Sequence, residues 1–139
     1  MVLSTQVLEH VYATDFYLKE CFRLLKKEGL LILSTHGLWP YHAFPEDFHR
    51  WTRNGLVKEV ENYGFKCLKV YPILGPFASA SQFTILLLAE KLQSRKLLSR
   101  LSLFIISLVA NALIWLEDKL FPQTEISDAS LFVICAKKM

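Results

Sequence analysis

The stretch VLSTQVLEHV, residues 2–11, decides the fold of this chain. It opens with apolar residues, is interrupted by Ser4, Thr5 and Gln6, and ends in Leu-Glu-His-Val. An apolar strand that runs directly into a polar turn is typical of the buried strands of α/β proteins, whose carboxyl ends lead into functional loops. Strands of this kind normally lie in the middle of a sheet, so we ask what lies beside this one.

The residues that follow predict one crossover unit. Thr14 is expected to cap a helix over 15–27, and Gly29 is its expected stop. The apolar face of this helix is formed by Leu18, Cys21, Phe22 and Leu25. The run GLLILSTHG, residues 29–37, then predicts a strand buried on both faces, as parallel strands are. Strand, helix and strand together predict a right-handed β-α-β unit.

Beyond this unit the sequence predicts a loop, a second helix and two further strands. The aromatic, proline-bearing stretch over 38–51 is expected to form a loop over the strand ends. A helix is predicted over 52–63, with Gly64 as its stop. The last two strands are expected over 65–71 and 130–137.

The segment between the last two strands differs in character. The chain is expected to break at Pro72, Gly75 and Pro76. Two helices are then predicted, over 83–96 and over 97–121, the second ended by Pro122.

Residues 101–116 carry no charge, and this leaves three alternatives for the second of these helices. It is a cap or subunit contact, an interfacial helix near lipid-linked substrates, or a membrane span, and we favour them in that order. A span requires about 20 apolar residues, more than are present here. Basic residues before the run and Trp115 near its end suit a membrane interface, so the second alternative is contact with a membrane surface through 97–121.

Composition bounds the class of protein. A length of 139 residues suits one domain, and 53% hydrophobic residues exclude a disordered chain. A net charge of +3 gives no support to a nucleic-acid partner, which would require a denser concentration of Lys and Arg. Cys21, Cys67 and Cys135 are far apart in apolar runs, so we expect buried, reduced thiols. Reduced thiols indicate a cytoplasmic protein, and peripheral location at the membrane is the alternative.

Several of these motifs together resemble one known family. They are VLEHV at 7–11, Gly29 with LLILST at 30–35, PEDFHRWTRNGL at 45–56, Gly64-Phe65, and VICAKK at 133–138. This combination resembles the class I S-adenosylmethionine-dependent methyltransferases of the type 11 set. The segment over 45–56 resembles members encoded with sugar and cell-envelope enzymes.

The resemblance implies an α/β fold, the C-terminal half of a seven-stranded Rossmann-like methyltransferase sheet. The chain would supply strands 4, 5, 6 and 7 of that sheet, with a helical insertion between the last two. Residues 1–71 and 127–139 would form this half-domain, and 72–126 the insertion. The glycine-rich turn and the acidic residue of the family's front half have no counterpart here, since none of the five glycines forms GxGxG. We therefore expect a fragment whose first strand pairs with a missing N-terminal half or a homo-oligomer partner.

The resemblance also implies site residues. His10, after the first strand, is the candidate general base for a hydroxyl acceptor, because histidine titrates near neutrality; the alternative is a histidine that only hydrogen-bonds the neighbouring loop. Thr5, Gln6 and Glu9 would contact the cofactor S-adenosylmethionine. Related methyltransferases hold a metal with E-x-x-E-H, but Gln6 replaces the first glutamate here, so no metal is predicted even though His36, His42 and His49 lie in the following loop.

Substrate selection is expected in the loop over 36–51. The candidate substrate-binding residues are His36, Tyr41, Asp47, Arg50 and Trp51. In the competing interpretation Asp47 pairs with Arg50, and the aromatic residues bury against the second helix.

Two functions follow. The first is methyl transfer from S-adenosylmethionine to a small or lipid-linked acceptor such as a sugar or cell-envelope precursor. The alternative is a non-enzymatic, membrane-associated or partner-binding fragment derived from such an enzyme.

Overall fold

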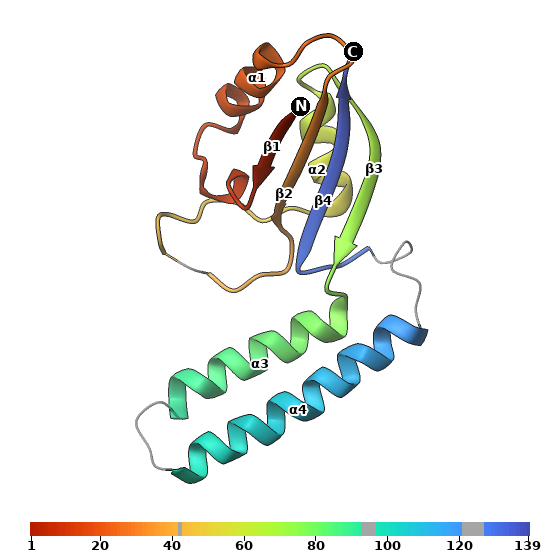
Figure 1. Cartoon of the computed structure of the whole chain (residues 1–139). Coiled ribbons are helices and arrows are strands. Elements are labelled where there is room, and N and C mark those ends of the chain that lie inside the picture. Colours follow the sequence, from red (N-terminus) through yellow and green to blue (C-terminus); the bar gives the residue numbers. More distant parts are fainter. Residues whose placement is uncertain (42, 93–96, 121–126) are drawn as a thin grey trace.

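A mixed four-stranded sheet forms the centre of the protein in the computed structural model, which describes residues 1–41, 43–92, 97–120 and 127–139 (Figure 1). In chain order the elements are β1 (Val2–Thr5), the short 3-10 helix η1 (Leu8–His10), α1 (Thr14–Leu24), β2 (Leu30–His36), α2 (Arg53–Glu61), β3 (Phe65–Ile73), α3 (Pro76–Leu92), α4 (Leu97–Leu120) and β4 (Leu131–Lys138). This mixed α/β architecture agrees with the predicted class.

The strand order is β1-β2-β4-β3. β1 is parallel to β2, and Thr5 lies opposite Ser34. β4 is antiparallel to both β2 and β3, so β1, β2 and β3 all run in one direction and their carboxyl ends meet at one end of the sheet. Among the described residues β1 pairs with β2 alone, which leaves it at an edge of the sheet.

One face of the sheet carries the hydrophobic core. The buried residues come from η1, α1, α2 and three strands: Leu8, Leu18, Cys21, Leu25, Leu31, Leu33, Leu56, Val60, Phe65, Phe132, Ile134 and Ala136. Because residues of α1 and α2 belong to one cluster, both helices pack on the same face of the sheet. Burying each large apolar side chain contributes about 1.5–3 kcal/mol to holding them there. On the opposite face Leu3 is 63% exposed and Tyr71 45% exposed.

The ends of α1 differ from the prediction. Thr14 is the first helical residue, not the cap, and its hydroxyl donates to Glu59 Oε1 at 3.0 Å. The helix ends at Leu24, before the predicted Lys27, because Lys138 Nζ donates to the carbonyls of Phe22 and Leu25 at 2.7 and 2.8 Å. A cation from β4 therefore binds C-terminal carbonyls of the kind that a glycine C-cap binds with backbone N–H groups.

The second helix and the third strand follow their sequence signals more closely. Thr52 caps α2 by accepting a hydrogen bond from the Gly55 N–H at 3.1 Å, and Gly64 has a φ of +87° just after the helix. β3, however, continues through Pro72, which we expected to break the chain. β3 lies at the other edge of the sheet, where the missing N–H of a proline is tolerated.

The segment between β3 and β4 forms a helical hairpin, which we define as α3 and α4 (Figure 1). α3 begins at Pro76, seven residues before the predicted start, because proline suits the first turn of a helix. At the base of the hairpin, the Glu117 carboxylate of α4 accepts hydrogen bonds from the N–H groups of Phe77 and Ala78, at 3.0 and 3.2 Å. Pro122, the predicted end of α4, lies outside the described residues.

The third alternative for this hairpin, a membrane span, is not supported. In the part of the chain that the structure describes, no helix has the length and apolar character needed to cross a bilayer.

The three cysteines are free, as predicted. Cys21 is buried, whereas Cys67 and Cys135 are half-buried. Burial raises the pKa of the Cys21 and Cys67 thiols above the usual value, so both stay protonated at neutral pH.

Replacing Gly37 with alanine is expected to lower the free energy of unfolding by about 1–3 kcal/mol. A Cβ at this position would lie 2.3 Å from the Ala129 carbonyl oxygen, a backbone atom, and 2.7 Å from the Phe132 ring. The start of β4 would therefore have to move. Urea unfolding measures the loss, and the exposed Ser127→Ala on the same turn is the control. Equal midpoints for the two variants would contradict this account.

Candidate functional site

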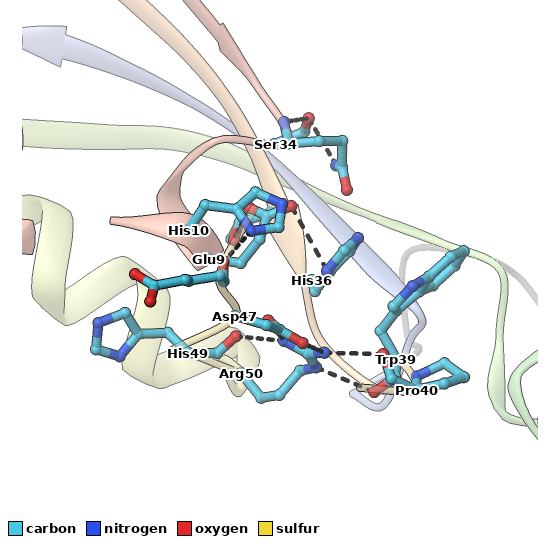
Figure 2. A network of polar contacts seen from close by, with 12 residues as sticks. Glu9, His10, Ser34, His36, Trp39, Pro40, Asp47, His49 and Arg50 are labelled. Atoms are coloured by element: carbon cyan, nitrogen blue, oxygen red, sulfur yellow. Dashed lines mark hydrogen bonds and ion pairs between the residues drawn. The ribbon is translucent and has the colours of Figure 1, made fainter. Parts of the chain in front are cut away.

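The turn that follows β1 is tied to the end of β2. Gln6 has a φ of 53°, and its N–H donates to the Ser34 carbonyl at 3.0 Å. Its side-chain amide donates to the Ser34 hydroxyl at 3.0 Å (Figure 2). Thr5, just before this turn, is exposed. Thr5 and Gln6 thus lie at the carboxyl ends of two parallel strands, where ligands bind in open α/β sheets.

Glu9 is the buried centre of the site. Its side chain has no exposed surface, and Oε2 accepts a hydrogen bond from the Thr35 hydroxyl at 2.9 Å. Oε1 lies 3.5 Å from His36 Nδ1, close enough for an ion pair but long for a hydrogen bond. The Glu9 carbonyl accepts from the N–H groups of Phe48 and His49, at 2.9 and 3.2 Å. Glu9 therefore joins η1, β2 and the loop.

These contacts give Glu9 a positioning role. A carboxylate with no exposed surface faces the interior, so its predicted contact with a cofactor stays a prediction.

His10 lies beside this cluster and is half-buried. Its Nδ1 is hydrogen-bonded to the carbonyl oxygen of Glu46 in the loop (Figure 2). Because a carbonyl only accepts, Nδ1 carries the hydrogen in this contact, and the neutral ring then has its lone pair on Nε2. The His10 and His36 rings meet edge to face, with centroids 6.5 Å apart. The contact with the loop thus sets the tautomer of neutral His10.

His36, a predicted substrate residue, is only 5% exposed. Its ring stacks on Trp39, with centroids 4.8 Å apart and an interplanar angle of 7°. Its carbonyl accepts from the Trp51 N–H at 3.0 Å. An incoming molecule would therefore meet Trp39 before His36.

Asp47 and Arg50 pair with each other, as the structural interpretation predicted. The Asp47 side chain is 1% exposed and binds both terminal nitrogens of the guanidinium. Arg50 also donates to the carbonyls of Trp39, Pro40 and His49, at 3.0, 2.9 and 2.7 Å (Figure 2). These contacts hold the loop in shape, and a substrate contact by either residue stays a prediction.

The other two predicted substrate residues lie apart. Tyr41 is 75% exposed, whereas Trp51 is half-buried against the hydrophobic core. A hollow of about 240 Å³ opens beside the Asp47–Arg50 pair. It is lined by Trp39, Tyr41, Asp47, Phe48, His49 and Arg50. Both polar and apolar groups face this space, so it suits a polar ring such as a sugar.

Sequence analysis missed three contributors to this site: Ser34, Thr35 and Trp39. Ser34 and Thr35 close β2 with two small hydroxyl residues in an otherwise apolar strand, and that change in character was the available signal. No pattern in the sequence signals that Trp39 covers His36, because the contact depends on how the loop folds.

No metal cluster of three or more His, Cys, Asp or Glu side chains was found in the described ranges. His42 lies outside these residues.

Comparisons with known proteins place this geometry in context. The family model for a methyltransferase domain matches residues 1–33, which contain β1, η1 and α1. No curated protein matches the sequence. Among solved structures, 18 chains match. One is the [4+2]-cyclase SpnF, with a TM-score of 0.52 and 14% identity over 98% of this chain and 48% of SpnF. The chain thus spans about half the length of SpnF.

A likeness at this identity shows the fold alone, a mixed α/β fold that is consistent with a Rossmann-like methyltransferase domain. The predicted strand numbers and the limits of the two segments stay predictions. The chain resembles the class I S-adenosylmethionine-dependent methyltransferases by sequence over residues 1–33, and its fold resembles that of SpnF over 98% of its length.

Proposed function

We propose that this chain takes part in methyl transfer from S-adenosylmethionine to a small or lipid-linked acceptor, such as a sugar or cell-envelope precursor. The observation that carries the proposal is the methyltransferase match over residues 1–33. This segment contains the turn at Gln6, the buried Glu9 and the ring of His10, all at the carboxyl end of β1.

In this proposal, S-adenosylmethionine lies against the residues at the carboxyl end of β1. Gln6 turns the backbone sharply after β1, so the backbone of Thr5 and Gln6 borders the space beyond the strand ends. When bound, S-adenosylmethionine supplies a methyl group already activated on a sulfonium. The chain then has to orient the acceptor in line with the methyl group, because correct positioning of the two reactants accounts for much of the rate enhancement.

His10 is the proposed general base. With Nδ1–H held by the Glu46 carbonyl, Nε2 is the atom that would accept the proton of an acceptor hydroxyl as the new carbon–oxygen bond forms. Glu9 positions this histidine indirectly, because its carbonyl binds Phe48 and His49 in the loop that also contains Glu46. The hollow beside Tyr41 is the proposed place for a sugar ring of the acceptor.

We further propose that a glycine-rich half of the domain completes the donor site by pairing with β1. Two observations support this. The chain covers 48% of SpnF, and β1 has an edge that no described strand covers. Such an edge presents unpaired N–H and C=O groups that favour the addition of another strand.

The test is S-adenosylmethionine binding, measured by calorimetry on two samples. One is the 139-residue chain, and the other is the same chain joined to the polypeptide encoded immediately upstream of Met1, in frame or in the neighbouring gene. We expect binding by the joined protein only. A joined protein that folds but fails to bind would contradict the proposal, and so would an upstream region that encodes no glycine-rich strand-turn-helix.

The alternative function is a non-enzymatic, membrane-associated or partner-binding protein. The exposed apolar surface of the helical hairpin favours it. Methylation of a cell-envelope extract by the joined protein would exclude this alternative as the whole function.

A further inference from the structure

The helical hairpin exposes an unusual amount of apolar side chain. The residues that are more than one-third exposed include Phe77, Phe83, Leu86, Leu87, Leu101, Phe104, Ile105, Leu108, Val109, Leu113, Trp115, Leu116 and Leu120. Monomeric soluble proteins rarely leave contiguous apolar patches larger than a few hundred Å² uncovered. Something therefore covers this surface.

The shape of the apolar surface distinguishes between occupants. On α4 the exposed apolar residues occupy about half of the helix circumference at 3.6 residues per turn. The contact with a second helix needs only a narrow stripe. An apolar face of this width is broader than the stripe that one partner helix covers, and it matches the face that an interfacial helix lays into the boundary between headgroups and acyl chains.

Two polar residues of the hairpin, Thr84 and Glu117, are hydrogen-bonded within it. The Thr84 hydroxyl donates to the carbonyl of Ala80 in its own helix at 2.8 Å. The Glu117 carboxylate is only 7% exposed and binds two N–H groups at the start of α3. Hydroxyls and carboxylates bound in this way do not need water, which suits an apolar surrounding.

The charge of the hairpin is complementary to an anionic surface. Residues 76–120 contain five cations and three anions, a net charge of +2; the cations are Lys91, Arg95, Lys96, Arg100 and Lys119, and the anions are Glu90, Glu117 and Asp118. At the other end of the apolar run Lys119 lies over the Trp115 ring, with Nζ 4.1 Å from the centroid. Cations and tryptophan flanking an apolar run are typical of helices at a membrane interface.

The hairpin is also placed where lipid contact would matter. The Ser79 and Ser130 hydroxyls are 2.7 Å apart, and the Ser130 N–H donates to the Leu74 carbonyl at 2.8 Å, so its base is fixed to the sheet. It projects from the same end of the sheet as the loop that follows β2 (Figure 1). A surface bound by the hairpin would therefore lie near the candidate site.

We propose that the helical hairpin docks the protein on the surface of a lipid bilayer that contains anionic headgroups. The apolar sides of α3 and α4 enter the boundary between headgroups and acyl chains, and the net positive charge of residues 76–120 attracts the anionic headgroups. This inference does not depend on methyl transfer, and its test measures no activity.

The experiment is co-flotation of the 139-residue chain with two kinds of vesicle, pure phosphatidylcholine and phosphatidylcholine mixed with phosphatidylglycerol. We expect partition into the mixed vesicles, weakened as the salt concentration rises. Each cation close to an anionic surface strengthens binding by about fivefold, so partition into pure phosphatidylcholine should be much weaker.

A charged variant locates the binding surface. The double substitution Phe104→Glu and Leu108→Glu is expected to weaken partition by at least about tenfold, because two apolar side chains no longer enter the lipid. Phe16→Glu on α1, where the phenylalanine is 67% exposed, is the matched control and should partition like the wild type. Circular dichroism checks that each variant is folded.

Three outcomes would overturn the proposal. They are no partition of the wild-type chain into mixed vesicles, equal partition into both kinds of vesicle, and equal loss in the Phe16→Glu control. If sedimentation instead finds a dimer that the double variant dissociates and that does not bind vesicles, the hairpin covers itself with a second copy and the proposal is wrong.

Discussion

Replacing Glu9 with alanine is expected to lower the free energy of unfolding by about 3–5 kcal/mol. The substitution removes a fully buried carboxylate that accepts from Thr35 and lies 3.5 Å from His36 Nδ1. It leaves both partners without the group they face and opens a cavity between η1 and β2. Urea unfolding, followed by circular dichroism, measures the loss.

Two controls separate this effect from a simple loss of charge. Glu9→Gln keeps the volume and an acceptor for Thr35, so its loss should be smaller, at about 1–3 kcal/mol. Glu20 also forms an ion pair, with Arg23, but on the surface of α1, so Glu20→Ala should leave the midpoint nearly unchanged. If Glu9→Ala and Glu20→Ala have equal midpoints, Glu9 does not hold the site together.

Replacing His10 with glutamine in the joined methyltransferase is expected to lower kcat by about 10²–10⁴-fold if the acceptor is a hydroxyl. Glutamine can still donate to the Glu46 carbonyl, so the loop keeps its contact, but it cannot take up the acceptor proton. The measurement is transfer of labelled methyl groups from S-adenosylmethionine into a cell-envelope extract.

The binding of S-adenosylmethionine to this variant decides between a base and a structural histidine. A base changes kcat and leaves the dissociation constant of the donor as it was, whereas a collapsed loop alters both. Tyr12→Phe, at a residue that is 80% exposed, serves as the control and should keep full activity. Unchanged kcat in His10→Gln would remove His10 from the mechanism.

The sequence predicted those elements whose signals are local. β2 is a continuous apolar run, and α2 is bounded by its own cap at Thr52 and a left-handed Gly64. The end of α1 was missed because its carbonyls are capped by Lys138, more than a hundred residues away in the chain. The start of α3 was missed because Pro76 was taken as a breaker, although proline also begins helices.

The candidate site also contains residues that could be predicted from local sequence and residues that could not. The place of Thr5 and Gln6 follows from the strand that ends at Thr5, and the pairing of Asp47 with Arg50 was one of two interpretations of opposite charges in the same loop. The burial of Glu9 could not be predicted, since carboxylates are seldom fully buried and its partners lie on β2. Side chains joined by tertiary folding carry no local pattern.

The hydrogen bond between Ser130 and Leu74 joins the two ends of the helical hairpin, and this has a consequence for which insertions the domain can accept between β3 and β4. β3 and β4 are adjacent antiparallel strands, and Leu74 and Ser130 already touch where the two strands end. A tight reverse turn would join them equally well, so a different connection could replace α3 and α4 without changing the register of β3 and β4. Relatives with a longer, shorter or differently charged connection would keep the same strand register while changing the surface that lies next to the candidate site.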